Sequence, residues 1–293
     1  MIHEDSPPVR AQGQGSNELA LLSGLLSCPI CRAELAIEPS NLRCSGCGAR
    51  FGIKDDVPLL AVQGTSETWG APQQVEQSTA YQDEYQNVEK AATYNLHYQQ
   101  RFLKRLTTGR EYALIRRHLR KVGHSRVILE LPCGGGRMTP SFADSTDLVI
   151  EADIAIGQIQ YGRATSILAT QRAWMTASAF HIPLRDDSVD GTICIRLAHH
   201  LPTHAERDRL FHELMRVSRR FVIVTYFDHH SLKNLTHRMR HPFRNKPPKL
   251  TMTTARVGEL ARECGGRLVS APALFLISSG HRYALIVKDG TQA

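Results

Sequence analysis

Residues 127–136 read Val-Ile-Leu-Glu-Leu-Pro-Cys-Gly-Gly-Gly, an apolar run that leads directly into three glycines. The run Val127–Leu129 predicts a buried strand. A glycine-rich turn after a strand lets backbone amides approach a bound ligand closely. A dinucleotide-binding turn would have a third glycine at position 139, but the chain has Thr139 there. The stretch therefore predicts a cofactor-binding turn and disfavours a nicotinamide cofactor.

Strand-like and helix-like segments alternate after this turn. Apolar runs at residues 147–150, 173–176, 191–195 and 221–226 predict strands, and apolar spacing predicts helices over 154–171, 207–217 and 257–264. Ser278-Ser279-Gly280 separates two further strands and predicts a hairpin. Upstream, Thr108 and Glu111 fit a capping box before a helix over 109–122. The fold predicted is α/β: a doubly wound, Rossmann-like, mostly parallel seven-stranded sheet with a C-terminal antiparallel hairpin.

Four of the seven cysteines lie close together near the N-terminus, in two C-x2-C pairs separated by twelve residues: Cys28, Cys31, Cys44 and Cys47. Two such pairs can deliver four thiolates to one tetrahedral Zn²⁺, and a site filled by four protein ligands is structural. We therefore expect a small zinc ribbon over residues 24–62. A disordered tail over 1–23 would precede it, and a linker over 63–83 would connect it to a larger domain over 84–293.

The chain is basic, with 36 Lys and Arg against 28 acidic residues and a net charge of +8. This charge favours an anionic partner: RNA, a phosphorylated small molecule or an anionic lipid surface. Nine cations and one acid, Glu111, lie between residues 101 and 126, which favours a solvated helix face, with a dedicated nucleic-acid surface as the alternative. Residues 233–249 hold six Lys or Arg and no acid, which predicts a basic lid over 228–251 for an anionic substrate, with a solvated loop as the alternative.

Composition also bounds the class of protein. A hydrophobic fraction of 42% and a charged fraction of 22% exclude a wholly disordered chain. No apolar run approaches the roughly 20 residues that a transmembrane helix needs. The first residues form no basic signal region, so we expect a cytoplasmic protein.

Five ordered segments give residues 91–293 a specific resemblance to the class I S-adenosylmethionine-dependent methyltransferases, close to the type 11 subgroup. The segments are Glu130-x-Pro-x-Gly134-x-Gly136, Asp153 after the second strand, residues 182–190, Ala198-His-His-Leu-Pro202 and Glu213-Leu-Met-Arg-Val217. The chain departs from the family pattern at Pro132, which replaces a glycine, and at Ser178, which replaces an acid. The ribbon resembles small zinc-ribbon activators that accompany tRNA and protein methyltransferases.

The resemblance implies S-adenosylmethionine as cofactor and a set of site residues. Asp153 would accept hydrogen bonds from the ribose hydroxyls, with Glu151 as the competing acid. Either His199 or His200 would act as a base toward the methyl acceptor, although adjacent side chains point in different directions and at most one should reach the pocket. The full cofactor-binding set implied is Glu130, Gly134, Gly136, Asp153, Ser178, Ala179 and Arg196.

Three functions remain open from the sequence. The first is a methyltransferase acting on a small or lipid-like anionic acceptor. The second is a ribosomal RNA (guanine) methyltransferase, because a zinc ribbon before this fold also resembles those enzymes. The third is a non-catalytic module of this fold. The ribbon could bind RNA, a protein partner or its own methyltransferase domain.

Overall fold

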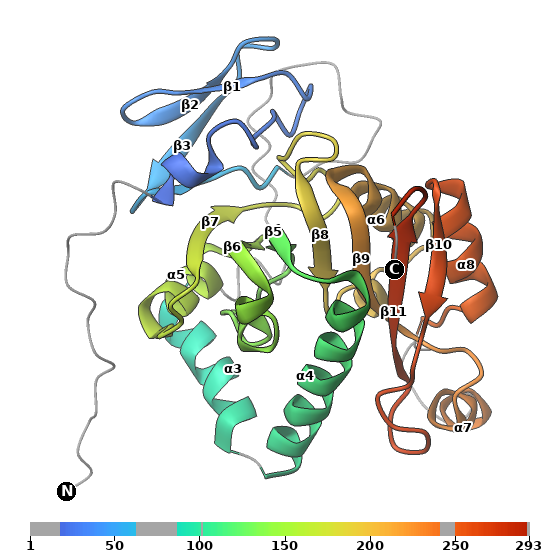
Figure 1. Ribbon diagram of the computed structural model, residues 1–293. Coiled ribbons are helices and arrows are strands. Elements are labelled where there is room, and N and C mark those ends of the chain that lie inside the picture. The colour runs from blue at the N-terminus through green and yellow to red at the C-terminus, as the bar shows by residue number, and fades with distance from the viewer. Residues whose placement is uncertain (1–17, 63–86, 101, 241–249, 292–293) are drawn as a thin grey trace, which may run out of the picture.

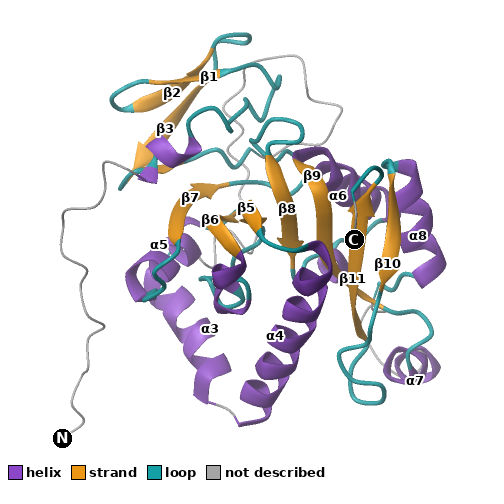
Figure 2. Ribbon diagram, viewed as in Figure 1, coloured by secondary structure: helices purple, strands orange, loops and turns teal. Residues whose placement is uncertain are grey.

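The structure is a computed structural model that describes residues 18–62, 87–100, 102–240 and 250–291. It contains a large sheet, flanking helices and a small N-terminal sheet (Figure 1, Figure 2). The helices are α3 (Val88–Gln100), α4 (Phe102–Val122), α5 (Ile156–Thr165), α6 (His204–Val217), α7 (Leu232–Arg240) and α8 (Thr254–Glu263). The small sheet is formed by β1 (Leu35–Ile37), β2 (Asn41–Cys44), β3 (Arg50–Lys54) and β4 (Val57–Pro58).

The large sheet has seven strands in the order β10-β11-β9-β8-β5-β6-β7. They are β5 (Ser125–Glu130), β6 (Thr146–Asp153), β7 (Gln171–Thr176), β8 (Val189–Cys194), β9 (Ser218–Phe227), β10 (Gly266–Ser270) and β11 (His281–Lys288). Strands β5 to β9 pair in parallel, and β11 pairs antiparallel to both β9 and β10. The predicted fold is confirmed. The strand order reverses between β5 and β8, and ligands bind beyond the carboxyl ends of strands at such a switch point.

Alternating residues of the strands face two separate layers of helices. Val222 and Val224 of β9 share a hydrophobic core with Leu214 of α6 and Leu260 of α8. Their neighbour Ile223 shares a second core with Ile115 of α4. Both faces of the sheet are thus covered, which explains why its central strands are continuously apolar.

Three expectations about local structure are wrong. Helix α5 ends at Thr165, and β7 already begins at Gln171, so the helix predicted over 154–171 is too long. Helix α4 begins at Phe102, which makes the capping box at Thr108 wrong because Glu111 lies well inside the helix. The disordered tail expected over residues 1–23 extends too far toward the C-terminus, because Leu22 belongs to a 3-10 turn and is buried in the core. Residues 1–17 and the expected linker lie outside the described residues.

The small sheet packs against the large one. Leu59, next to β4, forms a parallel bridge with Thr176 at the end of β7, and the Ala61 amide donates to the Thr176 Oγ1 at 3.1 Å. Leu26 and Leu184 form a second bridge. Ion pairs join Arg32 to Glu213 at 3.0 Å and Arg185 to Glu34 at 2.8 Å. The sequence left three binding partners possible for the ribbon: RNA, another protein or the chain's own large domain. The structure shows contact with the large domain.

Candidate cofactor, acceptor and metal sites

The glycine turn that follows β5 has a backbone conformation with positive φ angles, which residues other than glycine rarely adopt. Gly134, Gly135 and Gly136 have φ values of +51°, +79° and +73°. A Cβ atom on Gly135 would lie 2.6 Å from the Nδ2 atom of Asn95, whereas one on Gly134 would meet nothing within 4 Å. The turn is therefore packed on the Gly135 side and open at Gly134, where a ligand can approach the backbone. The peptide bond before Pro132, the first departure from the family pattern, is cis.

Asp153 ends β6 beside this turn and is fully buried. Its Oδ2 atom accepts a hydrogen bond from the Gly134 amide at 3.0 Å, and its Oδ1 atom accepts from the Ala155 amide at 3.1 Å. Burial raises the pKa of Asp153 to about 6, against the opposing effect of these donors. Each carboxylate oxygen keeps a second lone pair, so Asp153 can still accept from two hydroxyl groups.

This raised pKa predicts a pH-dependent affinity for S-adenosylhomocysteine. If Asp153 accepts from the ribose hydroxyls of the ligand, as the resemblance implies, a protonated Asp153 loses acceptor capacity and protons compete with those hydroxyl donors. We expect the affinity to be constant above about pH 7 and to fall below the pKa of about 6, by up to about tenfold per pH unit. Titration at several pH values measures this, and Asp153→Asn should flatten the profile. An equally steep fall in Asp153→Asn would assign the effect to another group.

Glu130 and Glu151 lie together behind the turn, and one hydroxyl joins them. The Thr139 Oγ1 atom is 2.7 Å from the Glu130 Oε2 and 2.6 Å from the Glu151 Oε1. One hydroxyl proton cannot serve two carboxylates. Burial and the neighbouring Glu151 raise the pKa of Glu130 well above its ordinary value.

Glu151 has further partners that keep it in the interior. Its Oε2 atom accepts from the Trp174 indole at 2.7 Å, and Arg172 lies 3.6 Å from its Oε1. The competing acid of the sequence analysis is thus directed at Thr139, Trp174 and Arg172, whereas Asp153 contacts the glycine turn.

Arg196 follows β8 and lies beside a buried carboxylate that the sequence analysis did not select. Glu111 of α4 accepts hydrogen bonds from the Arg196 Nε at 2.9 Å, the Arg137 Nη1 at 2.8 Å and the Tyr283 hydroxyl at 2.7 Å. Burial alone would raise the pKa of Glu111, but the two guanidinium groups hold it below its ordinary value. Glu111 thereby ties the glycine turn, the end of β8 and strand β11 together. In the sequence, Glu111 is the single acid among nine Lys and Arg residues between positions 101 and 126, and this pattern could have indicated its role.

Ser178 and Ala179 follow β7, next to Asp153 in space. The Ala177 amide donates to the Asp153 carbonyl at 2.9 Å, which holds the two strand ends together. Ser178 is buried, and its hydroxyl accepts from the Phe180 amide at 3.3 Å. The structure therefore brings Glu130, Gly134, Gly136, Asp153 and Ser178 to one edge of the sheet.

The two predicted histidines lie at the same edge, beyond β8, among other rings. The His199 ring lies 4.2 Å from those of His200 and Phe227 and 5.0 Å from that of His281, measured between centroids. Phe227 ends β9 and His281 begins β11, and the two residues are paired in the sheet. His199 is half-buried and His200 exposed. His281 was missed because only the antiparallel return of β11 brings it beside β8 and β9.

A cavity beside the glycine turn has a volume of about 670 Å³. It lies between α4 and the end of α5, and its lining includes Gly135, Gly136, Arg137 and Tyr112. Gly136 is the one residue of the predicted cofactor set that lines it.

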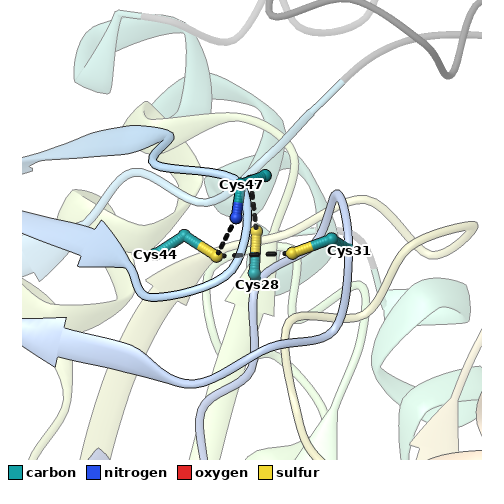
Figure 3. Close-up of side chains that lie close together, drawn as sticks. All are labelled: Cys28, Cys31, Cys44 and Cys47. Carbon is teal, nitrogen blue, oxygen red and sulfur yellow. Dashed lines mark hydrogen bonds between the residues drawn. The ribbon is translucent and has the colours of Figure 1, made fainter.

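The four N-terminal cysteines form a candidate metal site (Figure 3). All four sulfur atoms lie within 4.8 Å of one another, with 3.8 Å between Cys28 and Cys47 and 3.3 Å between Cys31 and Cys44. Four sulfurs around one Zn²⁺ at about 2.3 Å would be about 3.8 Å apart, so this arrangement fits the ion. Amides of Ile30, Gly46 and Cys47 point at the sulfurs of Cys28 and Cys44, which would stabilise thiolates.

The part of the chain from β5 into β9 is similar to a methyltransferase domain. A model of the methyltransferase domain family matches residues 129–223, from β5 into β9. No curated protein matches the chain. None of the helices in the described ranges is both long and apolar enough to cross a membrane.

A solved structure of a methyltransferase shares this fold. Magnesium protoporphyrin IX methyltransferase from Synechocystis with bound S-adenosylhomocysteine is 17% identical, with a TM-score of 0.59 over 71% of this chain and 98% of that one. The methyltransferase complex with the Trm112 activator from Haloferax volcanii is 14% identical, with a TM-score of 0.46 over 61% of this chain and 93% of that one. At these identities the likeness concerns the fold alone.

Proposed function

We propose that the chain transfers a methyl group from S-adenosylmethionine to a small or lipid-like anionic acceptor. The observation that supports this most is the gathering of two sets of residues at one edge of the sheet. Gly134 and Asp153 lie on one side of the switch point, and His199 and His281 lie on the other. One set suits a cofactor with hydroxyl groups, and the other suits an acceptor that must lose a proton.

The cofactor would lie against the backbone of Gly134 and Gly136, which is open at Gly134. Its sulfonium supplies an already activated methyl group, so the protein contributes binding, alignment and electrostatics. Asp153 would hold the ribose hydroxyls, and Ser178 and Ala179 would border the adenine. Glu130 and Arg196 would act indirectly, because Glu130 bonds to Thr139 and Arg196 to Glu111.

His199 is the stronger candidate for the base. A neutral imidazole can take a proton from an attacking oxygen or nitrogen. The His199 ring is packed against Phe227 and His281, which fixes its orientation, whereas His200 is exposed. The basic residues of α7, which follows β9, would favour an anionic acceptor near these rings.

We also infer that the cysteine cluster holds a structural Zn²⁺ that keeps the ribbon folded. All four positions of a tetrahedral ion would be filled by protein sulfur, which leaves none for a substrate. The ribbon contacts the large domain through bridges and ion pairs, so a role inside this chain is favoured over capture of a separate protein partner.

The alternative of a ribosomal RNA (guanine) methyltransferase is less favoured. Several cations of the basic segment around α4 make contacts within the chain. Arg110 donates to the Leu274 carbonyl, Arg116 to the Pro140 carbonyl and Lys121 to the Ser270 hydroxyl. Bases of single-stranded RNA are usually held by stacking on aromatic rings, which are only 6% of the residues.

A methyl-transfer assay tests the acceptor class. Zinc-loaded protein would be incubated with radiolabelled S-adenosylmethionine and, separately, total RNA, extracted lipids and small anionic metabolites. We expect label in the lipid or small-molecule fraction. His199→Asn should lower the rate by about 100-fold, the usual contribution of a general base, and leave cofactor affinity unchanged. Label in RNA alone would overturn the acceptor proposal in favour of the alternative.

A further inference from the structure

Five exposed aliphatic side chains lie on helix α7 and on the loop beside it, at the end of the molecule opposite the ribbon. Leu232, Leu235 and Met239 of α7 are 54%, 42% and 70% exposed, and Leu276 and Ile277 in the loop before β11 are 82% and 75% exposed. They are half of the ten large hydrophobic side chains that are exposed in the described ranges. We refer to these five residues as the α7 patch. Figure 1 shows α7 beside the loop between β10 and β11.

The two parts of the α7 patch are held together. The Lys233 Nζ atom donates to the Ser278 carbonyl at 2.8 Å, and Leu232 and Leu276 line one small cavity. Asn234 is the buried anchor of the helix, because its Nδ2 atom donates to the Asp228 carbonyl at 2.8 Å. Leu232, Leu235 and Met239 follow one another at steps of three and four residues and so share a face of the helix. All three side chains are exposed, so this face of the helix points outward.

The sequence of the segments that carry the α7 patch is basic. Helix α7 itself holds Lys233, Arg238 and Arg240 and no acid. The one acid in residues 228–240 and 271–282 is Asp228, which is buried and paired with Arg282 at 2.6 Å. An apolar helix face with cations and no exposed acid is typical of helices that lie in the plane of an anionic membrane surface.

The shape and chemistry of the α7 patch favour a bilayer over other partners. A peptide or helix would need a groove, but the cavity between α7 and the loop measures about 120 Å³, below the roughly 300 Å³ at which ligand pockets begin. RNA would need exposed aromatic rings, whereas the patch is aliphatic. Leu276 and Ile277 instead protrude at a loop tip, as side chains that insert among lipid headgroups do.

We propose that the α7 patch binds the surface of a bilayer that contains anionic lipids, with the five aliphatic side chains among the upper acyl chains and the cations at the headgroups. This would turn the carboxyl edge of the sheet, where β9 ends and β11 begins, toward the membrane. The proposal does not depend on the acceptor class, since it concerns attachment of the protein and not the transfer step.

Sedimentation with vesicles tests the proposal. The full zinc-loaded chain would be mixed with vesicles of phosphatidylcholine alone or with one-third phosphatidylglycerol. We expect binding to the anionic vesicles that weakens with added salt. Leu276→Ser with Ile277→Ser, and separately Leu235→Ser with Met239→Ser, should each lower the binding constant about tenfold or more. Ile167→Ser is the matched control, because Ile167 is also highly exposed but follows α5, at the other end of the sheet.

Several results would overturn the proposal. One is wild-type protein that stays in solution with anionic vesicles, and another is double variants that sediment like the wild type. A concentration-dependent dimer that the same substitutions abolish would assign the α7 patch to a second copy of the chain, and an RNA shift that they abolish would assign it to RNA. Cofactor titration and thermal melting of each variant separate loss of membrane binding from misfolding or a failed cofactor site.

Discussion

Removal of the Zn²⁺ that we propose for the four-cysteine cluster is expected to lower the melting temperature of the whole protein by about 10 °C or more. Leu22, Leu26 and Leu60 from the N-terminal segment belong to the same hydrophobic core as Met175 and Leu184 of the large domain. Each buried leucine contributes about 1.5–3 kcal/mol, so their loss approaches the roughly 5–15 kcal/mol by which a whole domain is stable. For a domain of this size about 1 kcal/mol corresponds to 2–4 °C.

The dependence on metal follows from the size of the ribbon. A four-stranded sheet of two to five residues per strand has little core of its own, and structural Zn²⁺ supplies about 10–16 kcal/mol in isolated zinc-finger peptides. Without the ion, the contacts at Thr176 and Leu184 would lose their rigid partner. The end of β7, which leads to Ser178, would lose its neighbour.

The measurement is thermal melting of the zinc-loaded protein before and after chelation, with metal content determined in parallel. Cys44→Ser should reproduce the effect of the chelator. Cys264→Ser is the matched control, because Cys264 lies outside the cluster at the end of α8. One zinc per chain is expected. A chelated protein that melts like the loaded one would contradict a structural role for the cluster.

The second large effect is expected from Asp153→Ala, which should weaken binding of S-adenosylhomocysteine at least about 100-fold. The carboxylate would accept two hydrogen bonds from the ligand, each worth about 1.5–3 kcal/mol when one partner is charged. Equilibrium dialysis with labelled ligand measures the change. Asp153→Asn keeps one acceptor oxygen and should give an intermediate loss.

Asp147→Ala provides the matched control for this substitution. Asp147 lies on the same strand, β6, but at its amino end, where its side chain is exposed and pairs with His124. We expect unchanged affinity in Asp147→Ala. If both alanine variants bind like the wild type, the ribose contact assigned to Asp153 is wrong. If both lose affinity equally, the effect is one of folding.

Much of the fold could be predicted because its signals are local. The run 127–136 predicts both β5 and the turn after it, and the cysteine spacing predicts the cluster. Errors arose where tertiary contacts override local preference. Thr108 and Glu111 resemble a helix start, yet the helix continues because Glu111 is held inside by Arg137, Arg196 and Tyr283.

The candidate site was predictable only in part, for the same reason. Gly134, Asp153 and His199 follow predicted strands, and the carboxyl ends of parallel strands meet at one edge. His281 comes from an antiparallel strand far along the chain, and only the pairing of β11 with β9 brings it beside His199. The α7 patch likewise depends on a loop and a helix that are more than thirty residues apart in sequence.

Calorimetric titration of the zinc-loaded full chain with S-adenosylhomocysteine tests the central claim most directly. The account predicts one binding site per chain with micromolar affinity, lost in Asp153→Ala and kept in Asp147→Ala. Absence of both binding heat and any thermal shift at millimolar ligand would contradict it, because the proposed methyl transfer requires a bound cofactor.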